Sequence, residues 1–506
     1  MITKKRTLSK NRNVNTKNSR KKNRRLKIYN KKNSRPLHSK KKKKQTERTH
    51  KQNQISTKIN VFLGKLNLDE IARKTAYLIR SSPIIPFIFV YSLSMGLFGC
   101  GEISLDMLAI NINDVFGTDL TGSAFCQRMK EKKSVFFLKS CFEKLLAIQL
   151  ESSFDNQFNE VFSMFKGVIL EDSTGIELNK KAKRKFKGCG GLCSKSSLKL
   201  NWVFNLCCYS AIAVDIFSGN VPDQKNAKKS LKYFKKGMLI IRDLGYFSIS
   251  TLASIHTKGA YYLSRLHKNV CVYKNQEDDI PVDMPSFLKR ITIGNKSAKI
   301  PIFIGQEDRL SVQLIVQKVP IWVYRQRLKK YKKKIDGKAL SNDFIELAKY
   351  SIFITNVPDE LWISKHAHNG DIDFAKYIVQ IYKMRWQIEL LFKKFKSKTK
   401  LHIIKGKDGN PILCLIYGRL IALILSLMIL SFAAKHHYKG RETSLWKVAT
   451  WLTSRDRLAN AILNGNFYKL YDDFFKHFKL LCKNKRKRET ALEEIQKALD
   501  IEKLAA

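Results

Sequence analysis

The chain has 506 residues, of which 44% are hydrophobic, so it is long enough for several domains and too apolar to be disordered throughout. It carries 96 Lys and Arg residues against 42 Asp and Glu residues, a formal net charge of +54. A protein this basic is expected to bind a polyanion, and nucleic acid is the first candidate.

Residues 1–60 hold 23 Lys and Arg residues and a single acid, Glu47, for a net charge of +22. The remaining 446 residues therefore still carry +32. The first segment has few apolar residues and no periodicity, which predicts a disordered basic arm. It either contacts phosphates nonspecifically or is a solvated tail without a dedicated role. No apolar segment typical of a signal peptide follows it, so we expect a cytoplasmic, nucleoid-associated protein.

The ten cysteines are scattered and show no disulfide framework, which favours a reducing compartment. Cys189 and Cys193 lack nearby histidines, so free or buried thiols are expected rather than a structural zinc site. Two apolar stretches, Pro83 to Gly99 and Leu420 to Ala434, are interrupted by proline or short for a membrane span. We interpret both as buried helices of a large core. A membrane protein with a basic juxtamembrane arm is the weaker alternative.

Short helices are predicted between residues 66 and 148. The last pair, separated by a break at Thr118 to Thr121, suits a DNA-binding helix-turn-helix-like unit, although plain bundles contain similar pairs. The helical apolar spacing covers Leu68 to Arg80, Pro86 to Phe98, Ser104 to Phe116 and Thr121 to Met129.

From residue 165 the pattern changes to strands, in the order strand, strand, strand, helix, strand, helix, strand. This order predicts a ribonuclease-H-like α/β domain. The segments are Val168 to Leu170, Leu198 to Leu206, Cys207 to Phe217, a helix at Asp223 to Lys236, Met238 to Ile241, a helix at Ser248 to His256, and Tyr261 to Leu266.

Asp172 and Asp243 follow two of the buried apolar runs, and glycine follows each within three residues. Catalytic side chains often stand where strands end and loops reach solvent. Either aspartate alone could equally form a turn or cap a helix.

The segment 382–396 reads YKMRWQIELLFKKFK. At about 100° per residue, a helix places four of its polar side chains in one row within about 60°. These are Tyr382, Arg385, Glu389 and Lys396. The adjacent face, which is expected to be buried, holds Ile381, Met384, Ile388, Leu391, Phe392 and Phe395.

The row is either functional or an ordinary solvated face. Trp386 borders it and could stack on an unpaired base or pack in the core. If the fold brings the carboxylates of Asp172, Asp243 and Glu389 together, they repel one another, which predicts divalent cations between them. Two Mg²⁺ ions, for which Mn²⁺ could substitute, would clamp a phosphodiester at such a site.

These motifs resemble bacterial insertion-sequence transposases of the DDE type. They specifically resemble the insertion-sequence-four group, whose signature is Tyr, two residues, Arg, three residues, Glu, six residues, Lys. The chain has this signature without a gap, with EDSTG and IRDLGYF around the aspartates and ITNVP before the signature. The resemblance implies that Asp172, Asp243 and Glu389 are a catalytic, metal-binding triad. It also implies that Tyr382, Arg385 and Lys396 grip terminal phosphates.

The resemblance further implies a β-rich insertion between the second Asp and the Glu, at about 267–370. Its strands are expected at Ile291 to Ile304, Val312 to Tyr324 and Tyr350 to Ile354. We expect a basic arm at 1–60, a helical DNA-binding region at 61–150, a catalytic domain at 151–410 and a helical C-terminal region at 411–506.

The implied function is a DNA transposase that cleaves the ends of its element and joins the 3′-hydroxyl to target DNA, as a homodimer in the synaptic complex. A hairpin intermediate is implied only by the family. The alternative is a catalytically decayed transposase that acts only as a basic DNA-binding protein.

Overall fold

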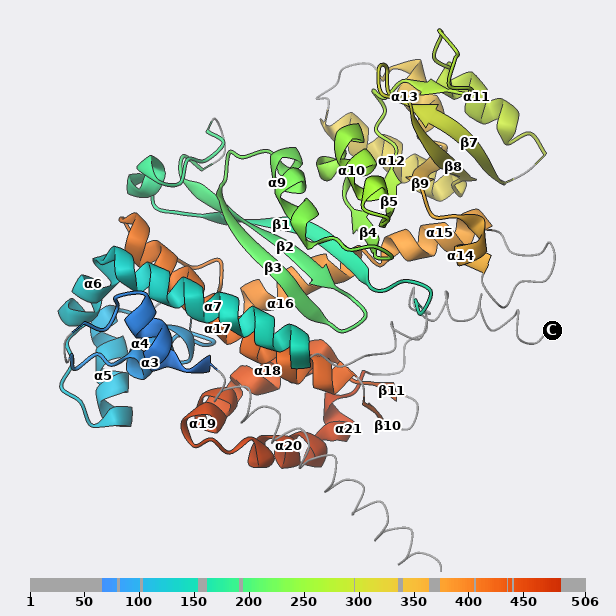
Figure 1. Cartoon of the computed structure of the whole chain (residues 1–506). Coiled ribbons are helices and arrows are strands. Elements are labelled where there is room, and N and C mark those ends of the chain that lie inside the picture. Colours follow the sequence, from blue (N-terminus) through green and yellow to red (C-terminus); the bar gives the residue numbers. More distant parts are fainter. Residues whose placement is uncertain are drawn as a thin grey trace, which may run out of the picture.

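A mixed nine-stranded sheet organises the part of the chain that this computed structural model describes, residues 66–483 without 80–81, 101–102, 153–161, 191–193, 295, 335–339, 364–373, 405, 435 and 439–440. The strand order is β3-β2-β1-β4-β5-β9-β8-β7-β6. The expected arm at 1–60, Cys193 and the basic run at 484–488 lie outside the described residues. Figure 1 shows the sheet running between a helical bundle at one end and a smaller group of helices at the other.

The first half of the sheet has the arrangement expected of a ribonuclease-H-like domain. Strands β1 to β3 are antiparallel neighbours, whereas β4 lies parallel to β1 and β5 lies parallel to β4. Their bounds, with the intervening helices, are β1 Val168–Glu177, β2 Ser197–Asn205, β3 Ser210–Ser218, α9 Asp223–Ser230, β4 Leu239–Arg242, α10 Ile249–Thr257 and β5 Tyr261–Arg265.

Strands β1 and β4 begin with apolar residues that are fully buried, because helices and other segments of the protein cover both faces of the sheet there. The predicted order of strands and helices is therefore confirmed. The helix predicted at Asp223 to Lys236 is shorter than expected: it ends at Ser230 and a 3-10 turn follows it at Leu231–Tyr233.

The segment between β5 and the signature extends the same sheet with antiparallel strands and adds the helices α11 to α14. Its elements are β6 Val272–Tyr273, α11 Met284–Ile291, β7 Ser297–Ile304, β8 Leu310–Lys318, α12 Ile321–Lys334, α13 Asn342–Leu347, β9 Tyr350–Thr355 and α14 Asp359–Ile363.

Two of the strand boundaries expected in this insertion were wrong. Ile291 ends helix α11, which Asp283 caps by accepting a hydrogen bond from Ser286 N at 3.1 Å. The strand expected at Val312 to Tyr324 stops at Lys318 and gives way to α12. Pro320 explains the change, because proline lacks the N–H that a strand ladder requires and suits the start of a helix.

The helices before and after the sheet pack on each other. Helix α17 (Gly409–Ala434) contacts α4 (Pro86–Ser94) and α7 (Lys132–Ser152), and a Cβ at Gly418 would overlap the Leu93 carbonyl. Among the described helices, α17 alone is long and apolar enough to cross a membrane, and 83% of its most apolar window is buried inside the protein. It is the core helix that the sequence predicted.

The remaining N-terminal helices are α3 (Leu68–Lys74), α5 (Leu105–Phe116) and α6 (Gly122–Lys130). Helix α3 is shorter than expected and is followed by Ala76 with a positive φ. Helices α5 and α6 contact each other across the predicted break. Arg128 on α6 is held inside the bundle, because it donates to Tyr77 O at 2.7 Å. The C-terminal helices are α18 Leu445–Thr453, α19 Arg457–Leu463, α20 Phe467–Lys476 and α21 Phe478–Leu481.

Candidate active site

Three carboxylates from distant parts of the chain face the guanidinium of Arg385. Arg385 Nη1 lies 2.6 Å from Glu389 Oε1 and 3.9 Å from Asp172 Oδ2, and Arg385 Nε lies 3.8 Å from Asp243 Oδ1. The Arg385 side chain is 11% exposed, while Asp243 and Glu389 are 48% and 44% exposed. The tertiary structure thus brings all three predicted catalytic acids to one place that solvent can reach.

The parallel pairing of β1 with β4 places the two aspartates together. Glu171 and Arg242 are partners in this ladder, and Asp172 and Asp243 follow them by one residue. Successive side chains of a strand point to opposite faces. Asp172 therefore leaves β1 on the face opposite to Glu171, and Asp243 leaves the end of β4 beside it.

Beneath the aspartates lies a buried polar network that the sequence analysis missed. Arg242 Nε donates to Glu171 Oε2 at 2.5 Å, and both side chains are almost fully buried. Asn201 Nδ2 donates to Glu171 Oε1 at 3.0 Å, Ser230 donates to the same carboxylate, and Tyr246 donates to Asn201 Oδ1 at 2.5 Å. A charged residue directly before each candidate aspartate was the available signal.

Arg385 stands at a junction between two helices, which corrects the prediction of one continuous helix. Helix α15 ends at Lys383 and α16 (Trp386–Lys398) begins after Arg385, and both run beside the sheet (Figure 1). Short-range hydrogen bonds such as Ile388 N to Arg385 O, 3.2 Å, tighten the chain there. The turn keeps Arg385 and Glu389 adjacent, as the spacing of four residues predicts.

The apolar face predicted for this segment is buried. Phe395 falls outside the side chains that the structure describes, and the other members, Ile381, Met384, Ile388, Leu391 and Phe392, are all in the core. Packing of this face fixes α16 against β1 and thereby aims Glu389 at Asp172.

The electrostatics of the cluster favour a neutral Asp172 or an added cation. The pKa of Asp172 is raised to about 7, chiefly by burial and also by the charges of Asp243 and Glu389, although Ser173 N and Arg385 act to lower it. Ser173 N donates to Asp172 Oδ1 at 2.8 Å. Arg385 Nε is buried without a hydrogen-bond acceptor in the described structure, so its interaction with Asp243 is purely electrostatic.

Lys396 and Tyr382 are anchored to the strands that carry the aspartates. Lys396 Nζ donates to Gly175 O of β1 at 3.1 Å, and burial lowers its pKa. The Tyr382 hydroxyl donates to Arg242 O at 3.3 Å, and burial raises the pKa of this phenol to about 12. Lys396 is therefore bound to β1 three residues beyond Asp172, and Tyr382 is bound to the backbone just before Asp243.

Trp386 is 63% exposed at the start of α16. The alternative in which Trp386 packs in the core is wrong. The buried face of this segment is formed by residues such as Met384 and Ile388. Its exposed indole is accessible for stacking on a base.

Asp223 is a further acid that sequence reasoning did not single out. It begins α9, and its Oδ1 atom accepts hydrogen bonds from Ser173 Oγ and Lys199 Nζ, both at 3.0 Å. Ser173 therefore links the two acids, because its hydroxyl donates to Asp223 and its backbone N–H donates to Asp172. Its place in a polar, lysine-rich helix gave no signal in the sequence.

Oxygen donors of this kind fit Mg²⁺, which prefers carboxylate ligands. In the described ranges, no three acidic, His or Cys side chains are close enough together to share one ion as they stand. Each carboxylate instead faces Arg385, which supplies the positive charge that the cluster requires. Asp172, Asp243 and Glu389 would hold a divalent cation in competition with this guanidinium.

Comparisons with known proteins agree with this geometry. Residues 163–425 match the family described as "Transposase DDE domain". The transposase for insertion sequence element IS1151 of Clostridium perfringens is 30% identical over 338 residues, which cover 64% of this chain and 69% of the relative. The transposase for insertion sequence element IS231B of Bacillus thuringiensis subsp. berliner is 26% identical over 442 residues, covering 83% and 89%.

Among solved structures, the chain is similar to piggyBac transposase in a synaptic complex with hairpin DNA, with a TM-score of 0.40 and 11% identity over 84% of each chain. The family match alone covers more than half of the sequence and contains all three acids and the signature. The chain therefore belongs to the DDE transposase family, within the insertion-sequence-four group, and is a DNA transposase.

Proposed function

We propose that this transposase hydrolyses DNA at the ends of an insertion sequence and joins the resulting 3′-hydroxyl to target DNA at the site around Arg385. The observation that carries the proposal is the convergence of Asp172, Asp243 and Glu389 within 4 Å of one guanidinium, although they lie up to 217 positions apart in the sequence. Two bound Mg²⁺ ions, or Mn²⁺ in their place, would neutralise the phosphate and activate the attacking oxygen.

Both reactions are displacements at phosphorus. In the first, a water oxygen bonds to phosphorus as the bond to the 3′ oxygen breaks, which leaves a 3′-hydroxyl and a 5′-phosphate. In the second, that 3′ oxygen bonds to a target phosphorus and the target's own 3′ oxygen leaves as a hydroxyl. One set of carboxylates serves both steps, because the bond made and the bond broken are of the same kind.

The cations of the signature have distinct roles in this proposal. Arg385 offers a planar fork that matches a phosphate, and Lys396 offers a compact charge at Gly175 of β1. Tyr382 holds the end of β4 through Arg242 O and presents its ring next to the seated DNA end. Trp386 is exposed and placed to stack on an unpaired base.

The proposed partners are the transposon ends, target DNA and a second copy of the chain in the synaptic complex, in the cytoplasm where the nucleoid lies. The relatives of this chain named above are transposases of insertion sequences, which supports DNA as the partner. The basic balance of the chain, +54, supports the same partner.

The test is a cleavage assay on duplexes carrying the element's end, with Asp172→Ala, Asp243→Ala and Glu389→Ala. Each variant is expected to lose Mg²⁺-dependent cleavage and to bind end DNA in the absence of metal. The control is Asp279→Ala, which removes an exposed acid of the insertion. Wild-type cleavage by any one of the three variants removes that residue from the triad. A wild-type protein that binds ends but never cleaves them is the decayed transposase of the alternative.

A further inference from the structure

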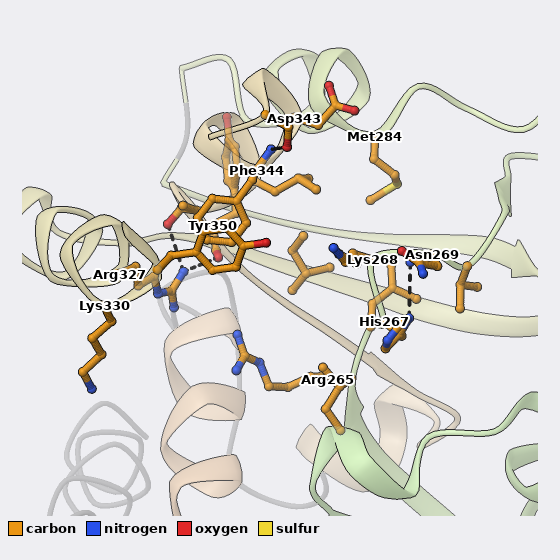
Figure 2. Close-up of a pocket in the computed structure, with 18 residues that line it drawn as sticks. Arg265, His267, Lys268, Asn269, Met284, Arg327, Lys330, Asp343, Phe344 and Tyr350 are labelled. Atoms are coloured by element: carbon orange, nitrogen blue, oxygen red, sulfur yellow. Dashed lines mark hydrogen bonds between the residues drawn. The ribbon is translucent and has the colours of Figure 1, made fainter. Parts of the chain in front are cut away.

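A cavity of about 680 Å³ lies between the end of β5 and the helices of the insertion. Its lining includes four cations, Arg265, Lys268, Arg327 and Lys330, and one acid, Asp343 (Figure 2). The walls come from the loop after β5, from α12 and α13, and from the start of β9. A cavity with this excess of positive charge suits an anionic ligand.

The cavity opens at the same edge of the sheet as the active site. Strands β4 and β5 are parallel, so their ends lie side by side, and Asp243 follows one while Arg265 ends the other. Leu244, the residue after Asp243, lines the cavity. Ligands of open α/β sheets bind at such carboxyl ends of strands.

A second path of contacts joins the cavity to the signature. Arg265 pairs with Phe353 in the ladder between β5 and β9. The Phe353 ring packs against the Tyr382 ring with centroids 5.0 Å apart. Phe353 thus links Arg265 to Tyr382 of the signature.

Two guanidiniums face the same space without an acid between them. Arg327 is fixed to the backbone, because Nη1 donates to Ala348 O at 3.0 Å and to Tyr350 O at 2.5 Å. Burial, together with the charge of Arg265, lowers the pKa of Arg327 to about 10. Figure 2 shows both guanidiniums on one side of the cavity and Asp343 on another. An anion between Arg265 and Arg327 would relieve their repulsion.

The other cations are free to bind a ligand. Lys268 and Lys330 are exposed, as is Arg265, and none of the three forms an ion pair with a residue in the described part of the chain. The Tyr331 and Phe344 rings stack with centroids 3.7 Å apart and make a rigid wall. Cations spread around a space this large suit several linked phosphates better than one small anion.

We propose that this cavity binds the phosphodiester backbone of a DNA strand that continues from the active site. This inference rests on the proposed function, since that function places a scissile phosphate at Asp172, Asp243 and Glu389. The strand belongs to the element's own end, to the flanking donor DNA or to the target, and the experiment distinguishes these sources.

The test compares two cavity variants with a matched control. The variants are Arg265→Ala/Lys268→Ala and Lys268→Glu/Lys330→Glu. The second variant leaves Arg265 unchanged, together with the Phe353 and Tyr382 rings that link it to the signature. The control, Lys235→Ala/Lys258→Ala, removes two exposed lysines that precede β4 and β5 at the opposite edge of the sheet. It therefore removes the same charge as the first variant from the same region of the fold.

Binding is measured by fluorescence anisotropy across a salt series, without Mg²⁺, on three duplexes. One ends at the cleavage position, one continues into flanking DNA, and one is unrelated DNA that stands for the target. The first variant is expected to weaken binding and to flatten the slope of log K against log salt by about one to two units. Loss with the first duplex assigns the strand to the element, loss only with the second assigns it to flanking DNA, and loss with the third assigns it to the target.

Cavity variants that bind all three duplexes as the control does overturn the inference. A parallel cleavage assay on wild-type protein separates this failure from failure of the proposed function. If the wild type cleaves ends and the cavity variants match the control, only the cavity inference is wrong. If the wild type never cleaves but the cavity variants lose DNA affinity, the cavity remains a DNA-backbone site and the proposed chemistry is wrong.

Discussion

Glu171 and Arg242 form an ion pair inside the sheet, and each immediately precedes one of the two aspartates of the active site. Their closest atoms, Oε2 and Nε, lie 2.5 Å apart, and Glu171 also accepts hydrogen bonds from Asn201 and Ser230. Since β1 and β4 are parallel, this pair locks the one register that sets Asp172 beside Asp243. Of the candidate catalytic acids, Asp243 and Glu389 are exposed and Asp172 is largely buried, while Glu171 and Arg242 hold the two strands together beneath them.

Breaking this pair is expected to destabilise the protein strongly. Glu171→Gln or Arg242→Met leaves the other partner's charge or hydrogen bonds unmatched in the interior, at a cost of about 3–5 kcal/mol in the free energy of unfolding. Urea denaturation measures the change. The double variant Glu171→Leu/Arg242→Met is expected to lose less than the sum of the single variants.

The exposed pair Glu70–Lys74 provides the comparison, and Glu70→Gln is expected to leave the urea midpoint near that of the wild type. A Glu171→Gln protein with wild-type stability would show that the pair does not hold the register.

The stability of the metal-free protein is expected to depend on Asp172 and on pH. Burial, followed by repulsion from Asp243 and Glu389, raises the pKa of Asp172 from 3.8 to about 7 in the folded state. A raised carboxyl pKa means that the folded state binds this proton more tightly than the unfolded state, so its contribution to stability is lost as pH rises from about 4 to about 7.

Asp172→Asn removes the cost of keeping a buried, ionised carboxylate at high pH. Without metal, the variant is expected to exceed the wild type in unfolding free energy at pH 8, by an amount on the order of 2–4 kcal/mol, and the difference should disappear near pH 4. Saturating Mg²⁺ should reverse the order at pH 8, because the ion stabilises only the protein that binds it. Urea denaturation at the two pH values, with exposed Asp279→Asn as control, checks both statements; a difference that is independent of pH contradicts them.

Arg385 is expected to compete with divalent cations for the carboxylates. It lies within 4 Å of Asp172, Asp243 and Glu389, so a cation must displace a guanidinium before it can bind them. Arg385→Gln is therefore expected to bind Mn²⁺ about tenfold more tightly than the wild type in the absence of DNA. Electron paramagnetic resonance of free Mn²⁺ measures this affinity directly.

The matched control for this experiment is Lys383→Gln, which removes a nearby cation that pairs with Gln380 rather than with the acids. Equal or weaker Mn²⁺ binding by Arg385→Gln would mean that Arg385 assembles the acids instead of competing for them.

The two kinds of positive charge in the chain are expected to differ in their salt dependence. Residues 1–60 carry +22 as many separate Lys and Arg groups, so their deletion should flatten the slope of log K against log salt by several units, for end DNA and random DNA alike. Lys396 is fixed to Gly175 O on β1, the strand that carries Asp172, so Lys396→Ala should change the slope by about one unit or less and reduce cleavage instead.

A salt titration on end and random duplexes, run beside a cleavage assay, compares the two variants. If Lys396→Ala lowers affinity for random DNA as much as for end DNA and leaves cleavage unchanged, this lysine belongs to a general basic surface.

Sequence by itself determined the order of strands and helices from β1 to β5, because buried strands contain short apolar runs. It did not determine where each strand ends, since β1 continues beyond its apolar run, through Asp172 to Glu177. It also determined the spacing of Arg385 and Glu389, which is a local property of a helical turn. The buried face of this segment followed from the same periodicity. Such features depend on neighbours a few residues away, and a single sequence records them.

Only the tertiary structure decided which groups meet. The break between α15 and α16, the burial of Glu171 with Arg242 and the cavity around Arg265 all depend on residues that lie far apart in the chain. The same is true of the guanidinium that stands among the three acids, since its partners come from β1, from the end of β4 and from α16. Which charge faces which is fixed by strand register and helix packing, and these result from burying apolar surface across the whole fold rather than from any local pattern.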